Sequence, residues 1–254
     1  MQNGLYVAAS GLLMQQERFD VISNNVANVN TNGFKQELAV FSDYRPVDKR
    51  YPQNWIQKTL YNRTINSSVK LDDINTNFEM GHFKQTGNSF DVALQDTKNF
   101  FAVETPWGVR YTRDGEFTMN SDGELVTRDG FNLLDRNTGA PIVIPPDRRY
   151  MDITGDGTVY VNNAPIGQVE VSRFEELEYL QKVGRNLYAA LDVLPEEPQN
   201  ATVTQGYVES SNVDPIMEMV RMIDAMRGFE LYQKVVHTYD SLNEQAANAI
   251  AKVQ

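Results

Sequence analysis

The chain has 254 residues and is acidic, with a formal net charge of −11 and a sequence pI near 4.7. This charge argues against nucleic acid as a partner, because phosphate binding needs concentrated Lys and Arg. The sequence contains no cysteine, which excludes disulfides, thiolate metal sites and cysteine nucleophiles. No apolar run reaches the about 18 residues that a membrane-spanning helix needs, and the N-terminus shows no cleavable secretory signal.

Residues 5–29 show the apolar period of a helix. Apolar side chains recur three and four residues apart, with Gln15 as the one polar break. This heptad spacing predicts an amphipathic helix. Gly33 follows the helix, and its freedom at positive φ suits a helix end. The stripe consists of Leu5, Ala8, Leu12, Phe19, Ile22, Val26 and Val29.

Five asparagines crowd the stretch that ends this helix. Asn30 and Asn32 fit a turn, because Asn accepts left-handed conformations and bonds its own backbone. Asn24, Asn25 and Asn28 fit a turn less well, and Asn is a mediocre helix former. Hydrogen bonds between subunits of an assembly would account for these three. Both interpretations stay open.

Residues 36–75 are predicted to form an extended connector with one or two strands. Pro46 and Pro52 exclude a continuous helix there.

Residues 76–205 are predicted to form a mostly antiparallel β domain rich in hairpins. Residues 100–103 are continuously apolar and indicate a buried strand. Asp-Gly between β-prone segments is a strong hairpin signal. It occurs at Asp114-Gly115, Asp122-Gly123, Asp129-Gly130 and Asp156-Gly157, and further strands are expected at 158–161 and 168–171.

Asp214 and Pro215 are predicted to open a second long helix, since Asp is a good N-cap and Pro favours the first helical position. The stretch 216–229 has a broad apolar stripe rich in Met, which suits either a core or a surface that meets several different neighbours. From Tyr232 to Val253, apolar residues again recur three and four positions apart. The apolar positions include Met219, Ile223, Met226, Phe229, Tyr232, Val235, Tyr239, Leu242, Ala246, Ala249 and Val253.

The two terminal helices are predicted to pair as a coiled-coil-like domain, because each has an apolar stripe with little else to cover it. The middle of the chain would then project as a separate domain. The fold class is therefore α+β, with segments 1–35, 36–75, 76–205 and 206–254 as N-terminal helix, connector, β domain and C-terminal helix.

The sequence contains no convincing catalytic constellation. His82 and His237 lack neighbours at metal-ligand spacing. Residues 152–157 resemble the start of a calcium loop, but the twelfth position is Asn163 where a Glu is required, so a hairpin turn is favoured. We therefore expect no enzyme activity, no cofactor and no metal. The paired carboxylates Glu175-Glu176 and Glu196-Glu197 indicate solvated charge rather than a glycosidase pair.

Four stretches resemble the signatures of bacterial flagellar rod and hook proteins, and together they cover nearly the whole chain in the family's order. Gly228 is a slight departure, since bulkier residues are commoner there. Length and the opening Gly4-Leu5-Tyr6 point to a rod protein, and residues 229–234 resemble the proximal rod type (FlgF) more than the distal type (FlgG). The stretches are SNNVANVNTNGFK at 23–35, QTGNSFDVAL at 85–94, YTRDG at 111–115 and the segment 206–230 that contains MIDAMRGFE.

The resemblance implies a structural subunit of the axial drive shaft. It would be exported unfolded by the flagellar type III apparatus without loss of its N-terminus. It would then assemble in the periplasm with other axial proteins and copies of itself, without nucleic acid or a small-molecule substrate. The terminal helices would form the inner tube through an interface that we expect at Leu5, Leu12, Phe19, Ile22, Asn24, Asn25, Val26, Asn28, Met219, Ile223, Met226, Phe229, Tyr232, Val235, Tyr239 and Leu242.

Two alternatives belong to other classes. One is a secreted β-rich binding module whose helices merely dimerise. The other is a hydrolase that uses surface carboxylates such as Glu175 and Glu176. Only the assembly hypothesis predicts terminal helices that stay disordered in the monomer beside a protease-resistant middle.

Overall fold

A computed structural model describes residues 2–44, 68–148, 150–184, 186–191, 194–196 and 202–251. The chain divides into two compact units. The helical unit comprises 1–26, 37–75 and 215–254, and the β unit comprises 27–36 and 76–214. Residues 27–36 and 206–214, which we expected with the terminal helices, thus group with the β unit. The helices and the antiparallel strands make the fold α+β, as predicted.

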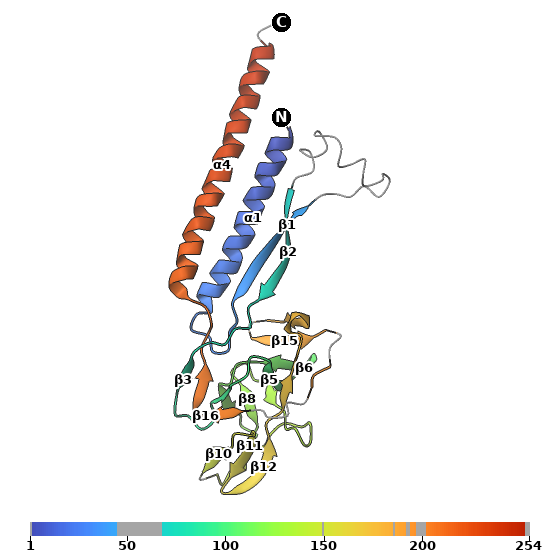
Figure 1. The fold of residues 1–254 in the computed structure, drawn as a ribbon, viewed down its shortest axis with the longest axis vertical. Coiled ribbons are helices and arrows are strands. Elements are labelled where there is room, and N and C mark those ends of the chain that lie inside the picture. The colour runs from blue at the N-terminus through green and yellow to red at the C-terminus, as the bar shows by residue number, and fades with distance from the viewer. Residues whose placement is uncertain are drawn as a thin grey trace. The chain divides into compact units, whose positions relative to one another are not determined.

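In the described residues, the helical unit contains two long helices and a β ribbon (Figure 1). Helix α1 spans Gln2–Ala27 and helix α4 spans Pro215–Ala251, so Pro215 is the first helical residue, as predicted. The helices run antiparallel, side by side (Figure 1). Strands β1 (Glu37–Tyr44) and β2 (Ser68–Thr76) pair as a two-stranded sheet within the expected connector. Pro46 and Pro52 lie outside the described residues.

The described part of the β unit contains one large sheet and three small ones. The large sheet has the order β14-β15-β6-β5-β9-β8-β7, and β13 also pairs with β5. The small sheets have the orders β10-β11-β12, β16-β4 and β17-β3. The strands are β3 (Phe83–Gln85), β4 (Val92–Leu94), β5 (Asn99–Thr105), β6 (Gly108–Thr112), β7 (Phe117–Met119), β8 (Leu125–Thr127), β9 (Asn132–Leu133), β10 (Met151–Ile153), β11 (Thr158–Val161), β12 (Ala164–Gln168), β13 (Val171–Arg173), β14 (Leu180–Lys182), β15 (Leu187–Ala190), β16 (Val203–Gln205) and β17 (Tyr207–Glu209).

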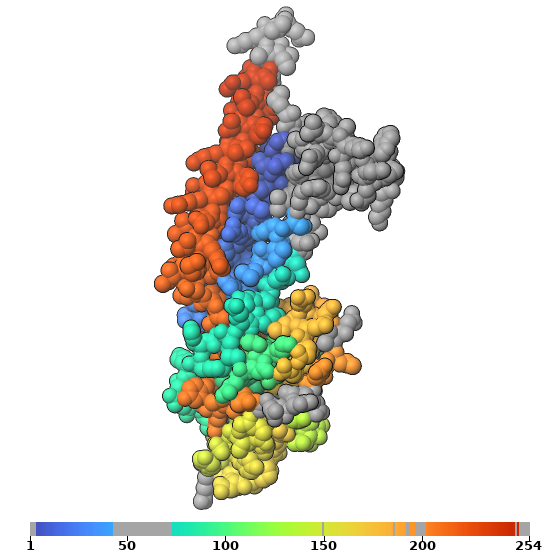
Figure 2. Space-filling model, viewed as in Figure 1, coloured from blue at the N-terminus to red at the C-terminus, as the bar shows by residue number. Residues whose placement is uncertain are grey.

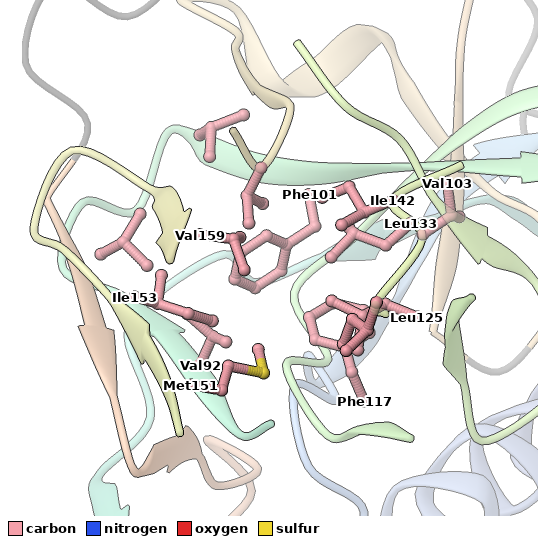
Figure 3. Close-up of a cluster of buried hydrophobic side chains, with 14 of the residues drawn as sticks. Val92, Phe101, Val103, Phe117, Leu125, Leu133, Ile142, Met151, Ile153 and Val159 are labelled. Atoms are coloured by element: carbon pink, nitrogen blue, oxygen red, sulfur yellow. The ribbon is translucent and has the colours of Figure 1, made fainter. Parts of the chain in front are cut away.

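Two apolar clusters form the core of this unit. The larger gathers side chains from strands far apart in sequence, with Phe101 packed edge-to-face on Phe117 (Figure 3). The smaller is aromatic and includes Phe100, Tyr111 and Tyr188. Phe100 and Phe101 belong to different clusters because successive side chains of a strand point to opposite faces. Residues 100–103 are all buried, as the continuous apolar run predicted.

Three of the four Asp-Gly pairs lie in turns between neighbouring strands. Gly123, Gly130 and Gly157 have positive φ, and each turn joins strands that pair with each other. Asp114-Gly115 is the exception, because β6 and β7 do not pair. A Cβ on Gly115 would lie 1.6 Å from the carbonyl oxygen of Val92, so this glycine permits a close backbone approach rather than a hairpin turn.

Two further expectations are corrected. The expected strand at 168–171 is divided between β12 and β13, which join different sheets. Gly33 has a positive φ of 69°, but α1 already ends at Ala27. A Cβ on Gly33 would lie 2.4 Å from the backbone nitrogen of Asp114, and its own N–H donates to the carbonyl of Glu209. Gly33 therefore allows the chain to pass close to the backbone of Asp114, and it does not cap the helix.

Candidate assembly interface

Helices α1 and α4 contact each other through small residues that face large ones. Tyr239 lies against Gly4, Tyr232 against Gly11, and Gln15 against Gly228. Both tyrosines were expected in the interface. Gln15, the polar break in the apolar stripe, is therefore part of the contact, and Gly228 leaves the space that its side chain occupies.

The residues expected in the interface on α4 differ in their exposure. Val235 and Leu242 are 43% and 48% exposed in the single chain, whereas Tyr232 and Tyr239 are less exposed. Val236 is less exposed than Val235, and Ala225 is buried. Spacings of three and of four residues both satisfy a heptad, so the sequence does not decide between Val235 and Val236. On α1, Ile22 is buried as expected, and Leu5, Leu12, Phe19 and Val26 are partly buried.

A large part of α4 exposes apolar side chains, and we call these residues the α4 apolar surface. Ile223 lies two residues from buried Ala225, which places it about 160° away around the helix. Met219 and Met226 are each about half exposed, and α1 adds exposed Tyr6, Val7 and Leu13. Extended apolar exposure marks an interaction site. The α4 apolar surface consists of Ile216, Met217, Met219, Val220, Ile223, Met226, Leu231, Val235 and Leu242. Figure 2 shows helix α4, which carries them, in orange and red.

The asparagines near the end of α1 find partners inside the chain. Asn25 is 1% exposed, donates to the carbonyl of Glu37 at 2.8 Å and accepts the Glu37 N–H at 2.9 Å. Asn24 donates to the Glu37 carboxylate at 2.8 Å, and the side chain of Asn28 accepts from Thr31 at 3.2 Å. Asn25 and Asn24 thus attach β1 to α1, and bonds between subunits are not needed to explain them.

Glu218 lies in the first turn of α4 and its side chain is 1% exposed. Its carboxylate accepts from the Asn25 amide at 3.4 Å and from the Arg221 guanidinium at 2.5 Å. A carboxylate is also stabilised by the positive end of the helix dipole. The start of α4 is therefore linked to the end of α1.

A buried charge cluster of Lys35, Arg113 and Glu209 joins distant parts of the β unit. The Glu209 carboxylate accepts from Lys35 Nζ at 2.6 Å, from Arg113 Nη2 at 2.6 Å and from the Gly81 N–H at 2.9 Å. All three side chains are at most 1% exposed. Burial lowers the pKa of Lys35, and the nearby Glu209 opposes that shift. Sequence reasoning did not find the cluster, because its members are 174 and 96 residues apart.

Residues considered for chemistry lie apart from one another. His82 and His237 are exposed. Over the described ranges, the structure brings together no three His, Cys, Asp or Glu side chains that could hold a metal. The calcium-like stretch forms the hairpin of β10 and β11, where the Asp156 carboxylate bonds to Thr154 and Thr158. Glu175 pairs with Lys98 and Arg173 at the surface. Glu197 lies outside the described residues.

No helix within the described part of the chain is long and apolar enough to cross a membrane.

Three family models match successive parts of the chain. The model for flagella basal body rod proteins matches residues 5–35. The model for the D1 domain of the flagellar hook protein FlgE/F/G matches 96–161, and the model for the C-terminal part of the flagellar basal body rod FlgEFG protein matches 204–249. The matches therefore fall on both terminal helices and on the middle of the β unit.

Relatives match over almost their full length. The chain is 32% identical over 254 residues to the flagellar basal-body rod protein FlgF of Caulobacter vibrioides, covering 100% of both chains. It is 34% identical to FlgG of Buchnera aphidicola subsp. Schizaphis graminum, covering 94% of this chain and 96% of the relative. It is 32% identical to FlgG of Bacillus subtilis, covering 98% and 99%. Identity alone therefore does not separate the FlgF type from the FlgG type.

Proposed function

Because this chain belongs to the family of flagellar basal-body rod proteins, we propose that its helical unit builds the inner wall of the rod and its β unit the outer layer. The chain is a structural subunit of the bacterial flagellar basal-body rod. This family is structural rather than enzymatic. In the proposal the subunit passes torque to its neighbours through contacts between helices.

The observation that carries this proposal is the α4 apolar surface. Burying apolar area stabilises an association by about 25 cal/mol per Å², and the side chains of this surface are 43% to 69% exposed in the single chain. Met219 and Met226 have flexible side chains that adapt to different neighbours. A subunit in a helical assembly meets several non-equivalent neighbours, so such a surface suits copies of this chain and other axial proteins.

The pairing of α1 with α4 as a coiled coil is the second part of the proposal. It is supported by the heptad spacing on both helices and by the contacts of Tyr232 and Tyr239 with α1. In this pair Leu5, Leu12, Phe19, Ile22 and Val26 supply the α1 side of the core.

The third part concerns location. We place the subunit in the proximal rod because residues 229–234 resemble the FlgF type and the FlgF relative matches both chains from end to end. Export through the flagellar type III apparatus without N-terminal cleavage, followed by assembly in the periplasm, fits a chain without cysteine. Labelling the protein in purified basal bodies tests this placement: signal next to the hook would favour the distal rod.

The assembly surface can be tested with a triple variant, Met219→Glu, Ile223→Glu and Met226→Glu, made in the full chain and expressed in cells that lack the native copy. Three carboxylates would have to be desolvated at the interface, so we expect export without incorporation into basal bodies, and loss of motility. The control carries Leu at the same three positions, which conserves apolar character, and should assemble. Normal motility of the Glu variant would contradict the proposed surface.

Limited proteolysis of the monomer tests the state of the helices before assembly. We expect rapid cleavage in residues 2–26 and 215–251 and resistance in residues 76–205. Protected terminal helices in a dilute monomer would favour the binding-module alternative.

A further inference from the structure

The contacts between α1 and α4 share a single antiparallel register. The two residue numbers in each contact pair add up to 243: Gly4 with Tyr239, Gly11 with Tyr232, and Gln15 with Gly228. The hydrogen-bonded pair Asn25 and Glu218 has the same sum. Four independent contacts, spread over most of α1, therefore agree on one axial offset between the helices.

In three of these contacts a Cβ at the glycine would overlap the end of a side chain of the other helix, so that side chain would have to move. A Cβ on Gly4 would lie 2.3 Å from Tyr239 Oη, and a Cβ on Gly11 would lie 2.4 Å from Tyr232 Cε1. A Cβ on Gly228 would lie 2.7 Å from Gln15 Nε2. Real Cβ contacts are essentially never this short, so each glycine accommodates a specific large side chain of the other helix.

Gly4 and Gly11 lie seven residues apart, as do their partners Tyr239 and Tyr232, and the Gln15–Gly228 pair lies four residues away, the other spacing of a heptad. Gly4, Gly11 and Asn25 are separated by multiples of seven residues, and so are Tyr239, Tyr232 and Glu218. Residues seven apart lie on the same stripe of a supercoiled helix. The contacts therefore follow one line along the pair instead of being scattered around it.

We propose that these four pairs form a register lock, which holds α1 and α4 of one subunit at a single axial offset. The lock rests on the proposed pairing of the two helices in the rod. It is needed because apolar heptads repeat, so a slip by one heptad would again place apolar stripes face to face. A slip by one heptad would keep a glycine against a tyrosine at one place only, and it would lose the Gln15–Gly228 and Asn25–Glu218 pairs.

A slip by one heptad in either direction disrupts the lock. It shifts the helices by about 10 Å. In one direction Gly4 would face Tyr232, but Gly11 would face Ala225. In the other direction Gly11 would face Tyr239, but Arg18 would face Tyr232. Both slips separate Asn25 from Glu218. A shaft that carries torsional load needs subunits whose two helices do not slide past each other, and the lock opposes that movement.

The lock also makes helix formation depend on pairing. Glycine inside an isolated helix is unfavourable relative to Ala, by about fivefold in the helix–coil equilibrium. Gly4 and Gly11 both weaken α1 on its own. Once paired, the same positions accept the tyrosine rings. The N-terminal segment can thus stay unfolded during export and become helical when it pairs with α4 in the assembly.

Engineered disulfides test the register in assembled basal bodies, and the cysteine-free sequence supplies a clean background. The in-register variant is Gln15→Cys with Gly228→Cys, since the Cβ position of Gly228 lies 3.3 Å from Gln15 Cγ. The slipped variants combine Gln15→Cys with Arg221→Cys or with Val235→Cys. After mild oxidation with copper phenanthroline, we expect an intrachain bridge in the first variant and about tenfold less bridging in the slipped variants.

The outcomes separate this inference from the proposed function. Equal bridging in the three variants, or bridges only between chains, would overturn the lock while leaving a rod subunit that is present in basal bodies. Absence of the unmodified chain from basal bodies would overturn the proposed function, and the lock with it. A bridge confined to the in-register variant supports both.

A size exchange provides the second test. If Gly11 is merely tolerated, Gly11→Ala should raise helicity and leave assembly intact. The lock instead predicts that a side chain at this position impairs assembly. Gly11→Leu should show at least tenfold less incorporation into basal bodies, and adding Tyr232→Ala should partly restore it. Gln16→Leu adds the same side chain at an exposed neighbouring position and serves as the control. Full incorporation of Gly11→Leu, or no rescue by Tyr232→Ala, would refute the lock.

Discussion

Replacing Glu209 by Gln should be one of the most damaging single changes in the β unit. The Glu209 carboxylate is the acidic partner in both ion pairs of the buried charge cluster, and it accepts from Lys35 and from Arg113 at 2.6 Å each. Gln keeps the size of the side chain but removes the negative charge. Two buried cations would then face each other without their shared counter-ion.

The magnitude follows from burial. Breaking a buried ion pair by removing one partner costs about 3–5 kcal/mol, and the three side chains are at most 1% exposed. For a unit of about 150 residues, each kcal/mol lowers the unfolding midpoint by 2–4 °C. The midpoint of Glu209→Gln should therefore fall by about 6–20 °C. Lys35→Met should cost less, since Arg113 and Glu209 remain as a neutral pair.

Thermal unfolding of the full chain, followed by far-ultraviolet circular dichroism, measures this effect. Glu175→Gln is the matched control, because Glu175 also pairs with two cations, Lys98 and Arg173, but its side chain is 49% exposed. Surface ion pairs contribute little, so the control should keep its midpoint. The reasoning is refuted if Glu209→Gln and Glu175→Gln unfold at the same temperature.

Three further predictions concern single residues. Burial raises the pKa of Asp114 from its ordinary 3.8 to about 6. The protonated carboxyl is therefore favoured in the folded state, so the free energy of unfolding falls by up to about 3 kcal/mol as the pH rises from 4 to 6. Asp114→Asn, which does not ionise, should remove this pH dependence in unfolding experiments at pH 4 and pH 6. Gly115→Ala should destabilise the β unit strongly, because its Cβ would lie 1.6 Å from a carbonyl oxygen, whereas Gly155→Ala, with its nearest atom 4.0 Å away, should unfold like the wild type in urea. Leu12→Asp should prevent incorporation into the rod while circular dichroism shows a folded β unit, and normal swimming on soft agar would contradict a role for this residue in the helical assembly.

Local patterns predicted much of the fold. The apolar period located both helices, and Pro215 marked the start of α4. Residues 100–103 are buried, as expected from a continuous apolar run. Three Asp-Gly pairs lie in turns between paired strands. These features depend on interactions between residues close in sequence, and their residue types therefore carry the signal.

Some features were decided by tertiary structure alone. Asp114-Gly115 has the sequence of a hairpin turn, yet the approach of the Val92 carbonyl, not strand pairing, explains its glycine. Val235 and Val236 both fit a heptad, and the position of α1 decides which of them is less exposed. The partners of Asn25 and Glu209 lie far away along the chain.

The sequence by itself therefore determined the two terminal helices, the β-rich middle and the α+β class, because the periods of helices and strands are carried by neighbouring residues. Only the tertiary structure decided the register of α1 against α4, the burial of Lys35 with Glu209, and the face of α4 that remains exposed. These depend on contacts between residues at least 174 positions apart, for which no local pattern exists.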